Sequence, residues 1–453
     1  MTRKRRFKLL IAGPLCVAAP VAIALLLTGG EYPAASTRPP VALSPKDFQI
    51  APGTPESPAQ RTVVVLLFDG FAPALLDGQD TPALPRMRRE GAWTHHMVPP
   101  FPSISLIGGF TISTGCWPEH HGVVTNRFFD PQRGFYDHSR DADWVTGCEE
   151  LHQAAERQGV PTATLGWYGE VSSTRGKLAR IVEYAPTWRE SPSDAQRADQ
   201  VIRVLQLPKE QRPQLILAYF RGPDGAEHFH GMESVETRAA VTQADRIVGS
   251  VLDTIHAVGL ESHATLIVTT DHGMVPITHL INVEYLLRNE GIAARTVATG
   301  TTAFVYLNDG ARTDDAARKL AGHEEFDVID PRAQPTWSHL GTGARVGDLI
   351  LSAKPGYVIE DRGQWPWFIR WLAWTGPVFL DASRSLKASH GYPPDTPGVH
   401  GLFYAWGDGI KRDHEVERID AIDIHPTVTH LLGIQPGNPV DGRVASEFLS
   451  AGS

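Results

Sequence analysis

The chain reads Val63-Val64-Val65-Leu66-Leu67-Phe68 and then Asp69. An unbroken apolar run of this length is typical of a strand that is buried on both faces of a parallel sheet. A polar side chain directly after such a strand lies at the carboxyl edge of the sheet, where open α/β sheets place their active crevice. Asp69 is therefore a candidate for a functional site.

The same arrangement occurs twice more along the chain. The apolar run 215–220 is followed by Asp224, and the run 265–270 is followed at once by Asp271 and His272. Because the carboxyl ends of parallel strands meet at one edge of a sheet, we expect these side chains to gather in a single site.

Strand-like and helical segments alternate through the rest of the chain. Candidate strands are residues 63–68, 162–167, 215–220, 265–270, 348–352 and 402–406, and apolar residues recur at helical spacing in 194–205 and 235–258. This alternation predicts an α/β fold with a mainly parallel central sheet and helices on both faces. The less regular stretch from about residue 281 to 389 is interpreted as an inserted cap.

Length and charge restrict the function classes. The chain has 453 residues, more than the roughly 250–300 at which a single core stops growing, which predicts one large domain with an insertion or two domains. We assign the catalytic domain to residues 61–448. The net charge of −9 provides no basic surface, which argues against a nucleic-acid polymer as main substrate and leaves small nucleotides open.

The N-terminus resembles a targeting segment. Residues 1–8 are a basic end that includes Arg3-Lys4-Arg5-Arg6, and residues 9–27 are uncharged. This uncharged stretch is long enough to span a bilayer and longer than a typical signal-peptide core. We interpret it as an uncleaved transmembrane anchor, with a cleaved signal as the alternative. The positive-inside rule then places the rest of the chain on the periplasmic or extracellular side, with the Pro-rich stretch 28–60 as a linker.

The region after this linker contains two cysteines, Cys116 and Cys148. In an oxidising compartment they can form a disulfide, and otherwise they are two buried thiols. Both alternatives are open at the level of the sequence.

Two pairs of side chains have the composition of metal ligands. Asp224 stands four positions before His228, so one helical turn can direct both at one ion, and Asp271 is adjacent to His272. Oxygen and nitrogen ligands without thiolate suit zinc and, less exclusively, manganese, iron or cobalt. The alternative is that Asp224 caps a helix and that His228 is an ordinary surface residue.

An ordered set of motifs favours the metal site. In chain order they are Phe68-Asp69-Gly70, Thr81-Pro82, Phe101-Pro102-Ser103-Ile104-Ser105, Thr114-Gly115-Cys116-Trp117-Pro118-Glu119-His120-His121-Gly122, Asn126, Pro223-Asp224 with His228, Asp271-His272-Gly273 and His390-Gly391-Tyr392. In this order and spacing, the sequence from about residue 62 to 432 resembles the nucleotide pyrophosphatase/phosphodiesterase family, the type I phosphodiesterases of the alkaline phosphatase superfamily. The resemblance implies an alkaline phosphatase-like three-layer sandwich with a cap.

The resemblance also implies a site with two zinc ions, although other divalent metals are open. Asp224, His228 and His390 correspond to the ligands of one ion, and Asp69, Asp271 and His272 correspond to those of the other, together with the oxygen of Ser105. Ser105 stands where the family has a nucleophilic Thr, with Ser103 as a competing hydroxyl. Asn126 follows Ser105 at the family's interval between the nucleophile and a phosphate-binding Asn.

The activity that this resemblance implies is hydrolysis of small phosphodiesters or pyrophosphates, of nucleotide or lipid-headgroup type. Two divalent ions lower the pKa of a bound hydroxyl and stabilise the leaving oxygen, so a phosphoseryl intermediate on Ser105 is expected. A backbone N–H near Leu106 and the amide of Asn126 are expected to contact the phosphoryl oxygens.

Several positions depart from the family pattern. Leu106-Ile107-Gly108-Gly109 stands where the family usually has Phe-Pro-Asn-His, so the wall of the pocket is expected to differ. Glu227 replaces a Gly, and we interpret it as facing solvent, with binding of a cationic part of the substrate as the alternative. His230 is a reserve ligand because it lies two residues beyond His228.

Two other functions are kept as alternatives. A phosphomonoesterase or phosphonate hydrolase would use the same two-metal site with different pocket residues. A non-catalytic, membrane-tethered binding protein would keep the fold without turnover. Neither the leaving group nor the oligomeric state follows from these residues.

Overall fold

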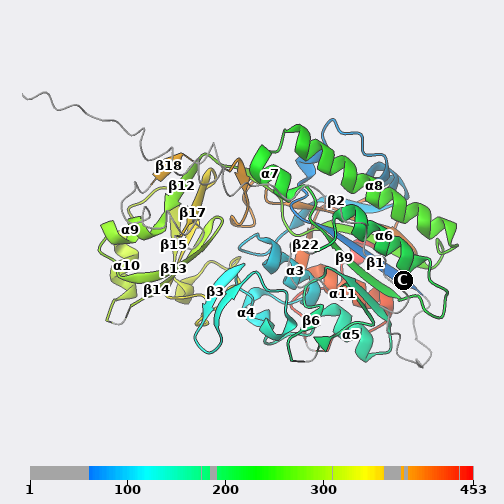
Figure 1. Cartoon of the computed structure of the whole chain (residues 1–453), viewed down its shortest axis with the longest axis horizontal. Coiled ribbons are helices and arrows are strands. Elements are labelled where there is room, and N and C mark those ends of the chain that lie inside the picture. Colours follow the sequence, from blue (N-terminus) through cyan, green and yellow to red (C-terminus); the bar gives the residue numbers. More distant parts are fainter. Residues whose placement is uncertain are drawn as a thin grey trace, which may run out of the picture.

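A nine-stranded sheet forms the centre of the chain (Figure 1). The computed structural model describes residues 61–174, 176–183, 191–308, 310–361, 379–381, 386–437 and 439–451. The strand order is β21-β2-β20-β10-β1-β9-β5-β8, and β22 also pairs with β2. These strands are β1 (Thr62–Phe68), β2 (Gly91–Val98), β5 (Thr162–Leu165), β8 (Ile181–Val182), β9 (Leu215–Phe220), β10 (Ala264–Thr270), β20 (Gly401–Gly407), β21 (His414–Glu415) and β22 (Ile419–Asp420).

Strand β1 lies in the middle of the sheet, and the sheet is the central layer of a three-layer sandwich. It pairs in parallel with β10 on one side and β9 on the other. Its alternate residues Val63, Val65 and Leu67 pack into one hydrophobic core, and the residues between them pack into a second core on the opposite face. A strand that is buried on both faces needs apolar side chains at every position, which explains its unbroken apolar sequence.

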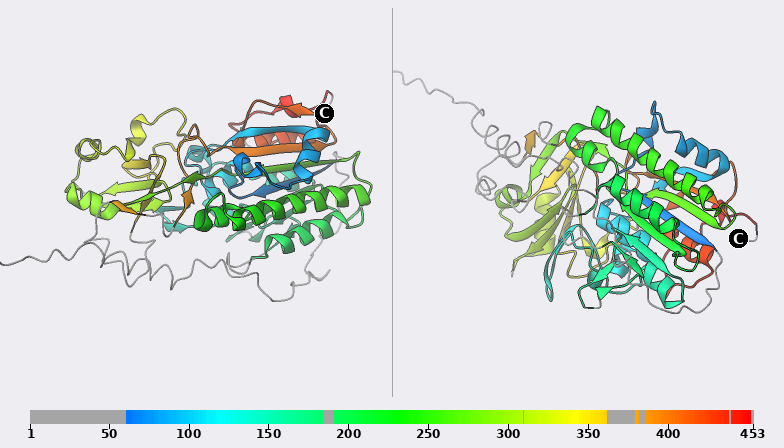
Figure 2. Two further views of the ribbon diagram at one scale, coloured as in Figure 1. Left: turned by 90° about the horizontal axis from the view of Figure 1, so that it is seen from above. Right: turned by 45° about the vertical axis from the view of Figure 1, so that its right-hand side comes forward.

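Helices cover both faces of this sheet (Figure 2). On one face lie α3 (Ser105–Thr114), α5 (Leu151–Arg157) and α11 (Ile424–Leu432), and on the other lie α2 (Ala83–Glu90), α6 (Asp194–Leu205) and α8 (Val235–Ala257). The predicted α/β fold with a mainly parallel central sheet between two helical layers is therefore confirmed.

A comparison of the predicted and observed strands shows where an apolar pattern is sufficient to locate a strand. The strand predicted at 215–220 has those bounds, and the run 265–270 is extended by one residue to form β10. Strand β2 was missed because it contains polar residues such as His95 and His96. The strand predicted at 348–352 corresponds to β16 (Leu349–Ala353), which belongs to a different sheet.

That second sheet lies beside the sandwich (Figure 1). Its four antiparallel strands are β13 (Ala294–Thr299), β14 (Thr302–Leu307), β16 and β15 (Phe326–Ile329), accompanied by α9 (Val283–Asn289) and α10 (Thr313–Leu320). A smaller sheet is made of β17 (Tyr357–Glu360), β12 (His279–Asn282) and β18 (Phe379–Asp381). Apart from β18, these elements share their own hydrophobic core, and together they cover much of the stretch interpreted as a cap, 281–389.

The predicted basic end 1–8, the uncharged stretch 9–27 and the linker 28–60 lie outside the described residues. Within the part of the chain that the structure describes, no helix combines the length and the apolar character that crossing a bilayer requires.

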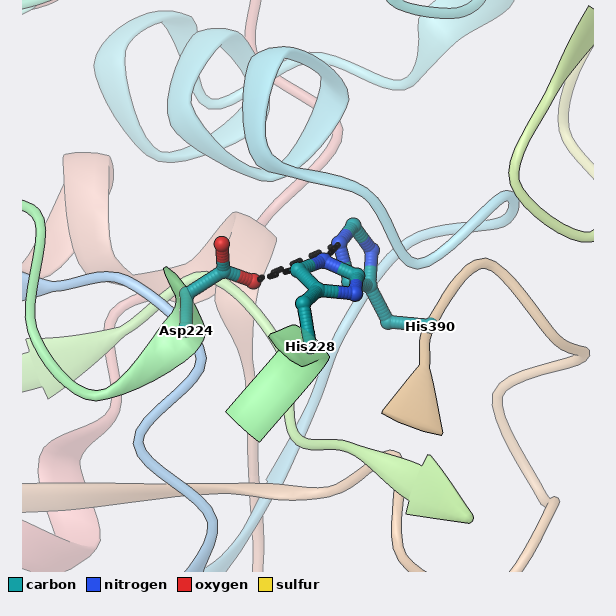
Figure 3. A group of neighbouring side chains, drawn as sticks. All are labelled: Asp224, His228 and His390. Carbon is teal, nitrogen blue, oxygen red and sulfur yellow. Dashed lines mark hydrogen bonds and ion pairs between the residues drawn. The ribbon is translucent and has the colours of Figure 1, made fainter. Parts of the chain in front are cut away.

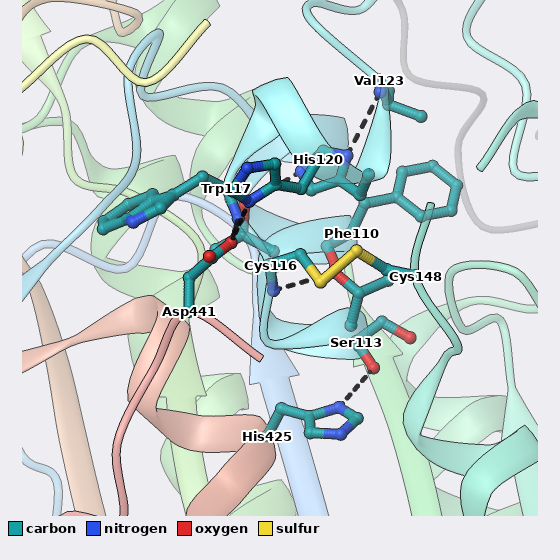
Figure 4. The surroundings of a disulfide bond; sticks show 12 residues. Phe110, Ser113, Cys116, Trp117, His120, Val123, Cys148, His425 and Asp441 are labelled. Carbon is teal, nitrogen blue, oxygen red and sulfur yellow. Dashed lines mark hydrogen bonds and ion pairs between the residues drawn. A yellow bond between two sulfur atoms is a disulfide. The ribbon is translucent and has the colours of Figure 1, made fainter. Parts of the chain in front are cut away.

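Cys116 and Cys148 form a disulfide (Figure 4). The bond joins the turn after α3 to the segment before α5. Close to it, the backbone N–H of Trp117 and Nδ1 of His120 both bind Oδ2 of Asp441, at 2.8 Å and 2.6 Å. The disulfide therefore ties the end of α3 to the start of α5, and both helices lie on the same face of the sheet.

We expect removal of this disulfide to destabilise the protein by about 3–4 kcal/mol, because the bond closes a loop with a sequence separation of 32 residues. Urea unfolding with and without reductant measures the change. The double variant Cys116→Ser/Cys148→Ser is the control, since its stability should not respond to reductant. Equal stability of the wild type in both conditions would show that the bond contributes nothing.

Candidate metal centre

Three neighbouring parallel strands bring most of the candidate residues together. Asp69 directly follows β1, Asp271 and His272 directly follow β10, and Asp224 begins α7 (Asp224–His230) shortly after β9. Because β1 lies between β9 and β10 in parallel register, the three carboxyl ends meet at one edge. The expectation that these side chains gather at the strand ends is confirmed.

The remaining residues reach this edge from other elements. Ser105 is the first residue of α3. His390 follows β19 (Ala388–Ser389), which pairs with β11 (Val275–Pro276) just beyond the end of β10. This short ladder is the reason that a residue 118 positions after His272 in the sequence returns to the same site.

The first group consists of Asp224, His228 and His390 (Figure 3). Oδ1 of Asp224 lies 3.3 Å from Nε2 of His228 and 3.4 Å from Nε2 of His390, and these two nitrogens are 3.1 Å apart. Asp224 and His228 are four positions apart on α7 and therefore share one face of that helix.

The second group consists of Asp69, Asp271 and His272, whose potential ligand atoms all lie within 4.8 Å of one another. Nε2 of His272 is 3.2 Å from Oδ1 of Asp69 and 3.8 Å from Oδ1 of Asp271. His272 and His390 connect the two groups, since their rings stack with centroids 3.7 Å apart.

All three imidazoles are oriented in the same way. Nδ1 of His228 binds the carbonyl oxygen of Ala388 at 2.8 Å, Nδ1 of His272 binds that of Gly273 at 2.9 Å, and Nδ1 of His390 binds that of Ser103 at 3.1 Å. A carbonyl oxygen can only accept a hydrogen bond, so Nδ1 is the donor in each ring, and in the neutral form of the ring the lone pair is on Nε2. This is the arrangement that backbone partners give to metal-binding histidines.

The carboxylates also fit a cation. Oδ1 of Asp271 accepts hydrogen bonds from the backbone N–H groups of Gly70, at 3.2 Å, and His272, at 3.0 Å. Oδ2 of Asp271 is buried and has no partner among the described residues. A buried carboxylate oxygen without a partner is costly, and a divalent ion would satisfy it. Both groups of residues therefore fit a metal.

The electrostatics agree with this interpretation. Burial, followed by the neighbouring charge of Asp69, raises the pKa of Asp271 well above its usual range. Burial would lower the pKa of His272, but the charges of Asp271 and Asp69 outweigh it and raise that pKa to about 10. Burial and the charge of His272 lower the pKa of His390 well below its usual value. The carboxylates of Asp69 and Asp271 are thus crowded together in a buried site, and a cation between them would relieve their mutual repulsion.

Ser105 is the hydroxyl that lies at this centre. Its Oγ donates to Oδ1 of Asp69 at 3.2 Å and is 3.2 Å from Nε2 of His272. Ser103, the competing hydroxyl, is fully buried and has structural partners: its Oγ donates to the carbonyl oxygen of Tyr392 and accepts from the N–H of Gly391. Only Ser105 is placed for chemistry beside the candidate metal ligands.

Asn126 lies next to Ser105, with a contact that was not expected. Its Oδ1 accepts the backbone N–H of Leu106 at 3.1 Å. In the described structure this N–H is bonded to Asn126, and the expected contact of a backbone N–H near Leu106 with a phosphoryl oxygen stays a prediction. The same bond orients the Asn126 amide, whose N–H donors remain for a ligand.

Glu227 corrects another expectation. It was interpreted as facing solvent, yet it is fully buried, and neither carboxyl oxygen has a hydrogen-bond partner among the described residues. Burial raises its pKa well above the usual range. Gly70 makes room for it, because a Cβ at Gly70 would lie 3.2 Å from Oε2 of Glu227. The reserve ligand His230 is exposed and belongs to neither group.

The departures in α3 also have a steric reason. A Cβ at Gly108 would lie 2.8 Å from Cβ of Asp271, and one at Gly109 would lie 2.1 Å from the ring of Tyr168. The wall of the site therefore requires glycine here. Sequence analysis missed Tyr219, whose hydroxyl donates to Oδ2 of Asp69. The only feature of the sequence that points to Tyr219 is that it is a residue with a hydroxyl group in an otherwise apolar strand.

Comparisons with known proteins agree with this geometry. The family model described as type I phosphodiesterase / nucleotide pyrophosphatase matches residues 63–393. An uncharacterised pyrophosphatase/phosphodiesterase of Schizosaccharomyces pombe is 26% identical and is matched over 84% of this chain and 79% of its own length. Ectonucleotide pyrophosphatase/phosphodiesterase family member 7 of Mus musculus is also 26% identical, over 88% and 90%. A venom phosphodiesterase of Crotalus durissus collilineatus is 24% identical, and the chain spans about half its length, 48%.

Among solved structures, murine ectonucleotide pyrophosphatase / phosphodiesterase 5 has the same fold. It superposes with a TM-score of 0.74 at 21% identity, covering 86% of this chain and 100% of that one. An inactive form of that murine protein has been solved in complex with AMP.

Proposed function

The chain belongs to the type I phosphodiesterase / nucleotide pyrophosphatase family, and we propose that it is a zinc-dependent hydrolase of small phosphodiesters or pyrophosphates. One observation carries the proposal. Ser105 Oγ lies within 3.2 Å of both Asp69 and His272, at a site where three imidazole Nε2 atoms and three carboxylates converge. Nitrogen and oxygen ligands without thiolate favour zinc.

The proposed reaction has two displacements at phosphorus. Two divalent ions, one held by Asp224, His228 and His390 and the other by Asp69, Asp271 and His272, would lower the pKa of the Ser105 hydroxyl and stabilise the leaving oxygen. Asp69 Oδ1 accepts the hydrogen bond of the Ser105 hydroxyl, which orients the oxygen for attack. Ser105 Oγ loses its proton and forms a bond to phosphorus as the bond to the leaving oxygen breaks, and that oxygen departs with a proton. Water then attacks the phosphoseryl intermediate and releases Ser105 as a hydroxyl.

Asn126 would hold the phosphoryl group during both displacements. Its Oδ1 is fixed by the N–H of Leu106, so its own N–H donors keep one orientation. Donors that are already aligned with developing charge cost no reorganisation during the reaction.

We expect Asn126→Ala to lower kcat by about 10²–10³-fold, the effect of removing one donor from an oxyanion site. Steady-state kinetics with a saturating nitrophenyl phosphodiester measures the loss, while zinc content and Tm are followed in parallel. Asn289→Ala at the exposed end of α9 is the matched control. A variant that retains wild-type kcat would remove Asn126 from the proposed mechanism.

Relative rates on three substrates test the function itself. The zinc-loaded protein is assayed for kcat/KM with bis(4-nitrophenyl) phosphate, 4-nitrophenyl phosphate and a nitrophenyl phosphonate ester. We expect the diester to be preferred, which would direct the search to nucleotides and lipid-headgroup diesters. Preference for the monoester or the phosphonate would favour those hydrolase classes instead. Zinc binding without turnover of any of them would indicate the binding protein.

We also propose that the protein is exported and held at the outer face of the cytoplasmic membrane by residues 9–27. The disulfide between Cys116 and Cys148 supports an oxidising compartment, since such bonds are rare in the cytosol. Protease treatment of intact spheroplasts tests this: an exported domain is digested, whereas a cytoplasmic one is protected.

A further inference from the structure

The two oxygens of Asp69 have different partners. Oδ1 accepts from Ser105 and lies 3.2 Å from Nε2 of His272, so it faces the reacting side of the site. Oδ2 accepts the hydroxyl hydrogen of Tyr219. The rotation of this carboxylate, and with it the direction of Oδ1, therefore depends on Tyr219.

Tyr219 is rigidly placed. It is the penultimate residue of β9 and is paired with Leu67 of β1, two residues before Asp69. Its ring packs edge to face against the ring of Tyr168, with centroids 5.6 Å apart. Tyr219 lies on β9 and Asp69 directly follows the adjacent strand β1, so the distance between them is set by the backbone.

The guanidinium group of Arg140 lies over the rings of both Tyr219 and Tyr168. The guanidinium carbon of Arg140 lies 4.2 Å from the centroid of Tyr219 and 5.0 Å from that of Tyr168. Arg140 is held there by a hydrogen bond of 2.6 Å from its Nη1 to the carbonyl oxygen of Gly166. A cation over a phenol ring is attracted by the ring electrons, and it makes the hydroxyl a better donor to a carboxylate.

From these contacts we propose that Tyr219, held beneath Arg140, is a positioning residue of the centre formed by Asp69, Asp271 and His272. It fixes Oδ2 of Asp69 so that Oδ1 is presented to the metal and to Ser105. This inference rests on the proposed metal-dependent function. Groups that orient a metal ligand in this way commonly contribute about 10–100-fold to metal affinity.

Tyr168 provides a matched control within the same cluster. Its ring neighbours that of Tyr219 and lies under the same guanidinium, and it is fully buried. Its hydroxyl, however, has no hydrogen-bond partner among the described residues. Tyr219→Phe and Tyr168→Phe therefore remove the same atom from adjacent rings, and only the first deletion takes a bond from Asp69.

The test compares zinc affinity in the full chain by competition with a chromophoric chelator. Tyr219→Phe should weaken one of two zinc equivalents by about 10–100-fold, while Tyr168→Phe should stay within about twofold of the wild type. The visible absorption of the Co²⁺-substituted protein should change only for Tyr219→Phe, because it reports on ligand geometry. Arg140→Met should weaken the same equivalent by a smaller factor, since it leaves the Tyr219 hydroxyl in place.

The outcomes separate this inference from the function on which it rests. A wild type that binds no zinc would overturn the proposed function and this inference with it. Two zinc equivalents that are unchanged in Tyr219→Phe would overturn the inference alone. Equal losses in both tyrosine variants would also overturn it, because they would indicate general packing of the cluster and not a bond to Asp69.

Discussion

Replacing Ser105 with alanine is expected to lower kcat for a phosphodiester by at least about 10³-fold. The variant lacks the oxygen that is 3.2 Å from both Asp69 and His272, so the first displacement has no nucleophile. The fold should not change, since the loss of one hydroxyl at the start of α3 leaves the packing of that helix intact. Single-turnover kinetics measures the loss of rate, and Tm and zinc content show whether the fold and the metal site are retained.

Ser103→Ala is the control for this experiment. The Ser103 hydroxyl is bonded to the backbone of Tyr392 and Gly391, so its removal should reduce stability by about 0.5–1.5 kcal/mol. Its kcat should stay within about tenfold of the wild type. If Ser103→Ala lost activity and Ser105→Ala kept it, the assignment of the nucleophile would be wrong.

Removing the metals with a chelator is expected to abolish hydrolysis and to lower Tm. In the described structure, Oδ2 of Asp271 has no partner and the Nε2 atoms of His228 and His390 face each other at 3.1 Å. A cation in each group of residues would bind these atoms, giving Oδ2 of Asp271 a partner and separating the two Nε2 atoms. Binding to the native state alone stabilises it by about 4 kcal/mol per site when free zinc is about 1,000 times Kd.

Calorimetry of the zinc-loaded and chelator-treated protein gives this difference, and activity should return when zinc is added back. A zinc-selective chelator is used for the treatment, and the same chelator saturated with zinc is the control. Activity and Tm that are both indifferent to chelation would rule out the metal centre.

The sequence predicts the sheet and the ligands because both depend on local patterns. β1, β9 and β10 are apolar runs, and the candidate ligands Asp69, Asp271 and His272 follow the ends of two of these runs directly. Parallel pairing then brings the strand ends together without further information. The helices α6 and α8 are predicted for the same reason, since their apolar spacing reflects a single buried face.

The parts that were missed depend on contacts between distant segments. Glu227 is buried because Gly70, on another loop, leaves space for it, and no local pattern reports that space. Strand β2 was missed because it carries polar residues. Its place in the sheet depends on its pairing with β20, which is distant in the sequence. Tyr219 contacts Asp69 only because Asp69 follows the strand that pairs with β9.

The stereochemical course at phosphorus tests the central claim, attack by Ser105, most directly. One enantiomer of a P-chiral phosphorothioate diester is hydrolysed by the zinc-loaded protein in ¹⁸O-water, and the configuration of the product is determined. Two successive in-line displacements, through Ser105 and then water, predict net retention of configuration. Net inversion would mean that water attacks the substrate directly, and it would contradict the phosphoseryl mechanism.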